Sequence, residues 1–353
     1  MALFPYTKNN HFKWGWGDTW YGAPEPAQPY RVHLGYTTRV PKSFREECVI
    51  AVKELASATD RPILVGLSGG SDSQMVCLSL RDAEIPYTAL IIRYEIDGGR
   101  CVNHHDTITA YKFCRRYDVP YQELTVDIDK FYRQQAPDIA RKYCMPKLET
   151  IIQCEAMDWA GNDWCYIMGG GDMMLIPVPA KVADTYDIPL LNNRLTVPCW
   201  WESPVPVMQY MLDQGYHGTS KFFLYTPELI ASYLNDPVTQ SFLQCAGAVL
   251  DAYIDLDPNS NNWWRCFHYL YKPMLTLREF PEIIPSKKYT GFEEFYGSRY
   301  RVDKMGMYSS ILEAAVKGLN PHQKVLVPIQ QVLEYVTTAH SESDVLTARR
   351  YGA

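Results

Sequence analysis

Residues 62–73 read Pro-Ile-Leu-Val-Gly-Leu-Ser-Gly-Gly-Ser-Asp-Ser, and this stretch decides the fold. Its first half, Pro62 to Leu67, is a short apolar run typical of a strand buried on both faces of a parallel sheet. Its second half, Ser68 to Ser73, is a tight glycine-rich loop, and residues 74–81 continue as a helix. This order favours phosphate binding, because free backbone N–H groups and a helix N-terminus attract anionic oxygens.

The residue types of the loop suit a polyphosphate. Gly69 and Gly70 allow close approach of the backbone and positive φ angles. Three hydroxyls add hydrogen-bond donors: Ser68, Ser71 and Ser73. The loop is not a Walker motif, which needs Gly-Lys-Ser/Thr, and it is not a Gly-x-Gly-x-x-Gly dinucleotide fingerprint.

Asp72 is the unusual member of the loop. A carboxylate repels phosphate, so its presence predicts a bridging Mg²⁺ between Asp72 and the phosphates. The alternative is a serine–glycine turn in which Asp72 merely caps the helix that follows.

Strands and helices alternate around this loop, which predicts an α/β fold with a doubly wound parallel sheet and helices on both faces. We expect strands at 62–67, 87–93, 121–127 and 164–168, and helices at 43–58, 74–81, 103–116, 128–141 and 147–160. Such sheets bind ligands at the carboxyl ends of their strands. A second glycine loop at 169–172 follows the fourth strand, so the two loops are expected to face one crevice. Arg93 ends the second strand on the same side, where it meets phosphate or a substrate carboxylate, or else forms a structural ion pair.

Three regions are expected along the chain. Residues 1–45 form an aromatic-rich, irregular N-terminal arm, and residues 46–175 form the domain that contains the phosphate-binding loop. Frequent prolines break the pattern after about residue 175, so residues 176–353 are interpreted as a mostly helical region that closes over the crevice. The helices expected there are 227–235, 238–253, 307–316 and 328–338.

Composition excludes several classes of protein. The 353 residues carry a formal charge of −6, so there is no strong nucleic-acid signal. No apolar run approaches the length of a membrane span, and the N-terminal sequence is not that of a secretory signal. The ten cysteines are scattered without a Cys-x-x-Cys pair, which favours free thiols in a reducing, cytoplasmic setting.

The string Ser68-Gly69-Gly70-Ser71-Asp72-Ser73 resembles the signature of the PP-loop ATP pyrophosphatase superfamily, over roughly residues 60–175. That superfamily includes asparagine, GMP, NAD and argininosuccinate synthetases and tRNA-modifying enzymes. The resemblance implies the adenine nucleotide α-hydrolase (HUP-like) fold, with ATP and Mg²⁺ as ligands.

Two further segments are similar to the synthetase domain of the asparagine synthetase group. Residues 169–172, Gly-Gly-Gly-Asp, resemble its second acidic loop, which implies that Gly170 borders the nucleotide and that Asp172 shares Mg²⁺ with Asp72. The alternative is another glycine turn with a capping aspartate.

Residues 271–273, Tyr-Lys-Pro, and then residues 280–292 resemble the C-terminal segment of the same group. There a lysine reaches the phosphates or the reacting centre, which implies a catalytic role for Lys287 or Lys288 together with Asp72. Lys272 is a weaker choice, and the alternative for each lysine is a solvated surface position.

The resemblance implies adenylation, in which ATP is cut to AMP and pyrophosphate to activate a carboxylate or carbonyl oxygen for amidation or a related ligation. The chain begins Met1-Ala2, without the N-terminal cysteine of the glutaminase found in asparagine synthetases. A small-molecule substrate is expected, with a homo-oligomer or an ammonia-supplying partner left open. The alternatives are a sulfur-transfer or sulfonucleotide enzyme of the same superfamily and a catalytically inactive nucleotide-binding scaffold.

Overall fold

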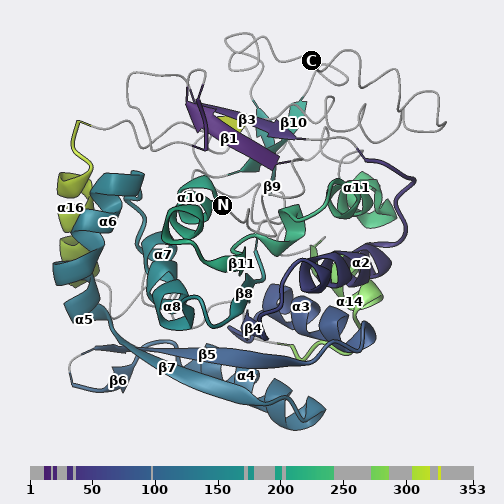
Figure 1. Cartoon of the computed structure of the whole chain (residues 1–353), viewed down its shortest axis with the longest axis horizontal. Coiled ribbons are helices and arrows are strands. Elements are labelled where there is room, and N and C mark those ends of the chain that lie inside the picture. The colour runs from purple at the N-terminus through teal and green to yellow at the C-terminus, as the bar shows by residue number, and fades with distance from the viewer. Residues whose placement is uncertain are drawn as a thin grey trace, which may run out of the picture.

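The centre of the molecule is a parallel sheet with the strand order β11-β8-β4-β5-β7 (Figure 1). In this computed structural model the described residues are 12–16, 19–21, 30–34, 37–96, 98–170, 174–178, 195–200, 204–241, 272–285, 304–318 and 325–326. The five strands are β4 (Ile63–Gly66), β5 (Tyr87–Ile96), β7 (Tyr121–Asp127), β8 (Cys165–Met168) and β11 (His217–Thr219). The short β6 (Arg100–Cys101) folds back antiparallel on the end of β5. The chain first builds outward from β4 through β5 to β7 and then returns to add β8 and β11 on the other side, which is the doubly wound arrangement.

Side chains of the central strands alternate between two hydrophobic cores, as expected for strands covered on both faces. In β4, Ile63 and Val65 belong to one core and Leu64 belongs to the other. β5 and β8 repeat the pattern, with Ala89, Ile91, Cys165 and Ile167 in the first core and Leu90 and Tyr166 in the second. The run at 62–67 is apolar because neither face of this strand meets water.

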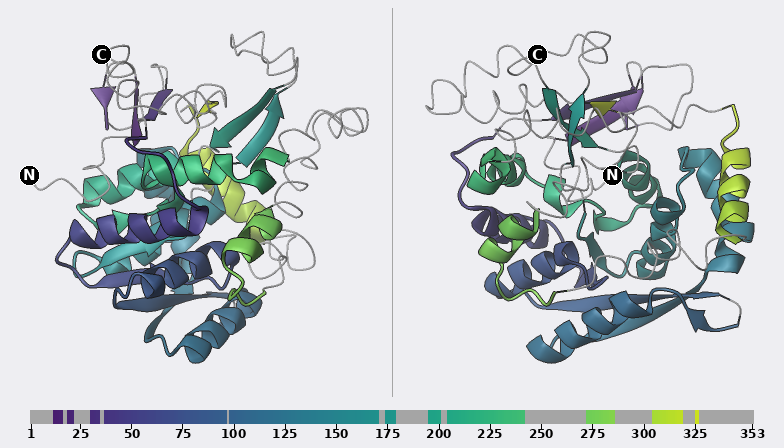
Figure 2. Two further views of the ribbon diagram at one scale, coloured as in Figure 1. Left: turned by 90° about the vertical axis from the view of Figure 1, so that its right-hand side faces the viewer. Right: turned by 180° about the vertical axis from the view of Figure 1, so that it is seen from behind.

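Helices cover both faces of the sheet (Figures 1 and 2). The first core contains residues of α2 (Phe44–Ser57), α3 (Ser71–Asp82), α4 (His104–Tyr117), α11 (Pro227–Asn235) and α14 (Lys272–Glu279). The second core contains residues of α5 (Ile128–Lys130), the π-helix η1 (Phe131–Gln135), α6 (Ala136–Tyr143), α7 (Leu148–Ile151), α8 (Gln153–Ala160), α10 (Pro204–Gln214) and α16 (Lys304–Ala315). The predicted doubly wound fold is therefore confirmed.

Two predicted helices differ in detail from the structure. The helix expected at 128–141 contains the π-helical turn η1, and it extends to Tyr143. Pro137 follows this turn, and because proline has no N–H to donate, the regular ladder is interrupted there. The helix expected at 147–160 is divided at Ile152 into α7 and α8.

Smaller elements were missed or fall outside the described residues. The expectation of an irregular N-terminal arm was wrong, because β1 (Phe12–Trp16), β2 (Thr19–Trp20) and β3 (Tyr30–Leu34) form an antiparallel sheet. A second antiparallel sheet contains β9 (Met174–Val178), β10 (Leu195–Trp200) and β12 (Val325–Leu326), and a 3₁₀ turn, η3 (Phe222–Leu224), follows β11. Both small sheets lie at the end of the molecule opposite β5 and β7 (Figure 2).

Residues 237–241 are helical, whereas the remainder of that predicted helix, 242–253, and the helix predicted at 328–338 lie outside the described residues. Within the described ranges, no helix is long and apolar enough to cross a bilayer.

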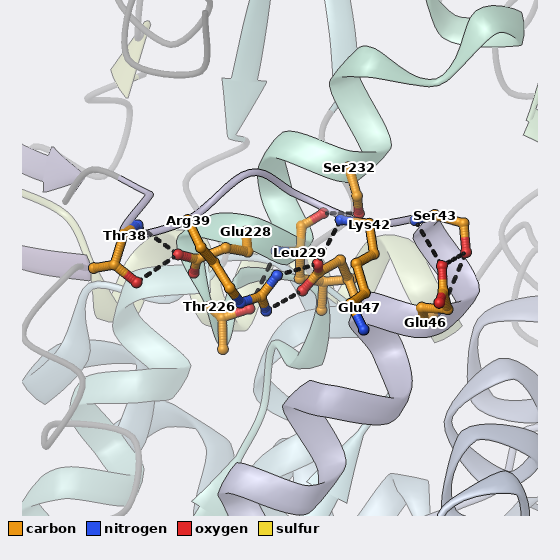
Figure 3. A network of polar contacts seen from close by, with 10 residues as sticks. All are labelled: Thr38, Arg39, Lys42, Ser43, Glu46, Glu47, Thr226, Glu228, Leu229 and Ser232. Carbon is orange, nitrogen blue, oxygen red and sulfur yellow. Dashed lines mark hydrogen bonds and ion pairs between the residues drawn. The ribbon is translucent and has the colours of Figure 1, made fainter. Parts of the chain in front are cut away.

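A polar network joins the segment before α2 to α2 and α11 (Figure 3). The Glu47 carboxylate is fully buried and accepts two hydrogen bonds from the Arg39 guanidinium, at 2.5 and 2.6 Å, and one from the Lys42 N–H at 2.7 Å. Glu228 of α11 accepts from the N–H and the hydroxyl of Thr38. The division of the chain into three regions stays a prediction. These bonds attach residues 38–42, at the end of the first region, to α2 and to α11.

Gly218→Ala tests the closest packing within the sheet. Gly218 in β11 has φ +114°, and a Cβ there would lie 1.9 Å from the carbonyl oxygen of Tyr166. We expect the free energy of unfolding in urea to fall by about 3 kcal/mol or more. The control is Gly306→Ala in α16, where a Cβ meets no atom within 4 Å. There we expect no loss and a gain of up to about 1 kcal/mol; equal losses in both variants would contradict the β11 register.

Candidate nucleotide-binding site

The two glycine-rich loops meet at the point where the strand order reverses. Residues 67–70 lead from β4 into α3, and Gly169 and Gly170 follow β8, the parallel neighbour of β4. A Cβ on Gly169 would lie 2.6 Å from the carbonyl carbon of Asp72 and 2.7 Å from the N atom of Ser73. The second loop therefore packs directly on the first turn of α3, at the carboxyl edge where doubly wound sheets bind ligands.

The first loop is held open by hydrogen bonds among its own residues. The Ser68 hydroxyl accepts from the N–H of Gly70 at 3.3 Å and lies 3.2 Å from the Ser73 hydroxyl, which donates to the Gly70 carbonyl. Gly69 has φ +86°, which confirms the positive φ expected from the sequence. These contacts fix a bend whose backbone faces the start of α3.

Asp72 is not the cap of α3. The N-cap is Gly70, which makes no side-chain capping bond, and Asp72 lies in the first helical turn. The first N–H groups of a helix have no partner within it, and the N-cap of α3 supplies no capping side chain for them. This geometry favours the anion-binding interpretation over the capped-turn alternative.

Helix α4 closes one side of the loop. A Cβ on Gly69 would lie 2.5 Å from the carbonyl oxygen of Asp106 and 3.0 Å from the N atom of Ala110. Only glycine fits at this position, for both its φ angle and its neighbours. A bound group therefore has no room between the loop and α4, whereas on the β8 side the border is formed by Gly169 and Gly170.

The side chain of Lys272 forms an ion pair with Asp72. Its Nζ lies 2.9 Å from Asp72 Oδ2, and its side chain is 4% exposed while that of Asp72 is 26% exposed. Lys272 is the first residue of α14, 200 positions from Asp72 in the chain. The sequence interpretation ranked it below Lys287 and Lys288, which lie outside the described residues, as does Asp172.

Gln74 links the loop to the segment after α14. Its side chain is fully buried, and its Nε2 donates to the carbonyls of Gly69 and Ile284 at 2.8 and 2.9 Å. Its Oε1 accepts from the N–H of Ile284 at 2.8 Å. The segment whose continuation contains Lys287 and Lys288 is thus attached directly to the loop.

Sequence reasoning missed Lys221. It follows β11, its residue is 9% exposed, and its Nζ lies 3.6 Å from the position of a Cβ on Gly170. The Gly170 carbonyl accepts from the N–H of Phe223 at 3.0 Å, which attaches this loop to the second glycine loop. Its strand is only three residues long and carries no apolar run, so the sequence held no signal for it.

Arg93 lies in β5 and pairs with Glu95 at 3.0 Å, which matches the structural ion-pair alternative. Its hydrogen bond to Glu95 raises the pKa of Arg93. A role for Arg93 at the nucleotide stays a prediction.

Seven cysteines of the described residues are free thiols: Cys48, Cys77, Cys101, Cys114, Cys144, Cys154 and Cys165. All of these except Cys101 and Cys144 are buried. Burial raises the pKa of Cys114 to about 11 and that of Cys165 to about 12. These thiols stay protonated at neutral pH, and a protonated thiol is a poor nucleophile. Within the described residues, no group of three or more His, Cys, Asp and Glu side chains gathers as a metal site.

The sequence matches no family model and no curated protein. Solved structures with some similarity include NMN synthetase from Francisella tularensis, at 16% identity over 35% of this chain and 52% of that chain, with a TM-score of 0.26. A tRNA methyltransferase subunit from Methanocaldococcus jannaschii matches at 12% identity over 45% of this chain and 66% of that chain (TM-score 0.27). An NH₃-dependent NAD synthetase from Campylobacter jejuni matches at 15% identity over 69% of this chain and 97% of that chain (TM-score 0.28). At these values the likeness assigns no family, and the fold assignment rests on the strand order.

Gln74→Leu tests the link between the loop and residue 284. Leucine leaves the carbonyl of Gly69 and both backbone groups of Ile284 without these partners, so we expect the free energy of unfolding to fall by about 2–3 kcal/mol. Hydrogen exchange at the Ile284 amide should become faster. The control is Gln122→Leu on the exposed edge strand β7, where the expected change is within about 0.5 kcal/mol. Unchanged exchange at Ile284 in the Gln74 variant would show that the link is dispensable.

Proposed function

We propose that this chain is an ATP-dependent adenylating enzyme, which cuts ATP to AMP and pyrophosphate and activates a carboxylate or carbonyl oxygen for amidation or a related ligation. One observation carries the proposal. A glycine loop leads into α3 at the switch point of the sheet, its N-cap Gly70 makes no side-chain capping bond, and Asp72 of the first turn is held by the buried Lys272.

The residues present fit a polyphosphate. The first N–H groups of α3 supply donors, and the hydroxyls of Ser68, Ser71 and Ser73 add more once a bound phosphate replaces their present contacts within the loop. Asp72 supplies a carboxylate of the kind that Mg²⁺ prefers, with Asp172 proposed as its companion. When bound, Mg²⁺ would neutralise charge on the phosphates.

Lys272 gives Asp72 a fixed position. An exposed ion pair is worth at most about 1 kcal/mol, whereas removing one partner from a buried pair costs about 3–5 kcal/mol. The Lys272 side chain is almost fully buried and that of Asp72 is partly exposed, so the pair lies between these limits. We propose that Lys272 orients Asp72 and adds positive charge beside the phosphates, and that Lys287 or Lys288 neutralises charge that develops during the reaction.

In the proposed reaction the substrate oxygen attacks the α-phosphorus of ATP. A new oxygen–phosphorus bond forms, and the bond between the α-phosphorus and the bridging oxygen breaks, so pyrophosphate leaves with the electron pair. An amine or ammonia then attacks the activated carbon, loses a proton to water, and AMP departs. The protein contributes mainly by positioning and electrostatic stabilisation.

Membership of the PP-loop superfamily, near the asparagine synthetase group, is part of this proposal and rests on the loop sequence and its place in the sheet. A cytoplasmic setting and an ammonia-supplying partner or homo-oligomer are proposed with it. The sulfur-transfer alternative gains no support from the buried cysteines Cys48, Cys77, Cys114, Cys154 and Cys165, because burial raises the pKa of each of these thiols. An inactive scaffold would bind ATP without forming AMP.

Asp72→Asn tests the function. We expect the wild-type protein to bind Mg-ATP in isothermal titration calorimetry and to release AMP and pyrophosphate when carboxylic acids are supplied. The variant should bind Mg-ATP at least about tenfold more weakly, because one charged ligand of the cation is lost. The control is Asp60→Asn, whose side chain is 93% exposed before the amino end of β4. Equal affinity of the two variants would sink the proposal, and ATP binding without AMP under any condition would support the scaffold.

A further inference from the structure

Residues 272–284, here called the α14 segment, pack beside α2 and α3 and contact the start of α3 at both of their ends (Figures 1 and 2). At the first end, Lys272 Nζ lies 2.9 Å from Asp72 Oδ2. At the other end, the N–H and the carbonyl of Ile284 bond to the side chain of Gln74, at 2.8 and 2.9 Å. The whole length of α14 therefore lies between two contacts with the start of one helix.

Arg45 of α2 holds the turn that follows α14. Its two Nη atoms donate to the two carboxylate oxygens of Glu282 at 3.0 Å each, and Nη1 also donates to the carbonyl of Glu279 at 2.9 Å. The guanidinium carbon lies 5.0 Å from the centre of the ring of Phe280, which is fully buried. A bidentate arginine–carboxylate pair fixes direction as well as distance. Arg45 therefore fixes both the position and the orientation of residues 279–282 on α2.

The turn that Arg45 holds lies between the two contacts with α3. Glu282 stands two positions before Ile284, so the turn sets where the backbone of Ile284 meets α3. The hydroxyl of Tyr117 in α4 also donates to the Glu282 carbonyl, at 2.6 Å, which attaches the turn to a second helix. A helix of eight residues is about 12 Å long and moves as one body. A displacement of its end at Glu279 therefore also displaces its beginning at Lys272.

We propose that Arg45 is a positioning residue of the proposed ATP site, which sets both contacts of the α14 segment with α3 by holding the turn at 279–282. This inference rests on the proposed function, because it takes residues 68–73 to bind the phosphates of ATP. Binding of Mg-ATP then stabilises the segment in its observed position, and a loosened segment weakens the binding of Mg-ATP. Hydrogen bonds from Arg45 lower the pKa of Glu282, so this ion pair is charged at neutral pH.

The second carboxylate that Arg45 contacts provides a matched control. The Nε of Arg45 donates to Asp82, the last residue of α3, at 2.8 Å. The side chains of Asp82 and Glu282 are 33% and 38% exposed, so the two ion pairs are similarly solvated. Of these two carboxylates, only Glu282 belongs to the α14 segment. A purely structural Arg45 predicts similar effects from the loss of either carboxylate, whereas a positioning Arg45 acts through Glu282.

The first measurement compares E282Q with D82N. Hydrogen exchange at the Ile284 amide is followed by NMR in the full chain without nucleotide. We expect exchange at least fivefold faster than in wild type for E282Q and within twofold of wild type for D82N, because only E282Q releases the turn. Equal acceleration in the two variants, or none in E282Q, would overturn the inference.

The second measurement tests the coupling between the segment and the nucleotide. Saturating Mg-ATP should slow exchange at the Ile284 amide of E282Q at least threefold, because the nucleotide favours the segment in its observed position. The control amide is that of Val119, which bonds to the Cys114 carbonyl at the end of α4. Its exchange should change less than twofold. A purely structural role for Arg45 gives no effect of Mg-ATP at Ile284.

The third measurement is the affinity for Mg-ATP by calorimetry. R45M should bind at least threefold more weakly than wild type, with partial recovery in R45K, which keeps the charge but not the bidentate geometry. The control R61M changes an arginine that is 41% exposed and precedes β4, and its affinity should stay within twofold of wild type. Thermal melting checks folding, and E282Q serves in place of R45M if that variant is unstable.

The outcomes distinguish the two levels of the argument. Faster exchange at Ile284 in E282Q that Mg-ATP does not slow, or an unchanged affinity in R45M, would overturn the positioning role and leave the proposed function intact. Failure of the wild-type protein to bind Mg-ATP would overturn the proposed function and this inference with it.

Discussion

The close approach of Gly169 to the first turn of α3 is the constraint on which the site depends. The parallel strands β4 and β8 are neighbours in the sheet although paired residues such as Ile63 and Cys165 are 102 positions apart in the chain, and their loops can meet only if the second has no Cβ at the point of contact. The point of contact is therefore lined by backbone, at the edge of the sheet where doubly wound folds bind ligands.

Elements from the second half of the chain complete the site. Lys272, the Gln74–Ile284 hydrogen bonds and Lys221 all reach the loop region across more than 50 residues of sequence from the glycine loops. The polar network of Glu47 and Glu228 likewise joins the segment at 38–42 to α2 and to α11, which belongs to the second half of the chain (Figure 3). Helix α14, which packs on one face of the sheet, therefore also brings the charged side chain of Lys272 to the loop. The packing of this helix and the chemistry of the loop depend on each other.

What the sequence predicts well is local. Buried strands show as apolar runs, and β4, β5 and β8 lie within a few residues of their predicted bounds because each buries side chains on both faces, whereas the edge strand β7 buries Leu124 and Val126 on one face. The loop at 68–73 was identified because a strand, glycines and a helix are contiguous. β11 was missed because it is short and contains Gly218, which is present for contact with Tyr166 and not for propensity. The contact of Lys272 with Asp72 was not predicted, because a contact over 200 residues leaves no periodic trace in the sequence.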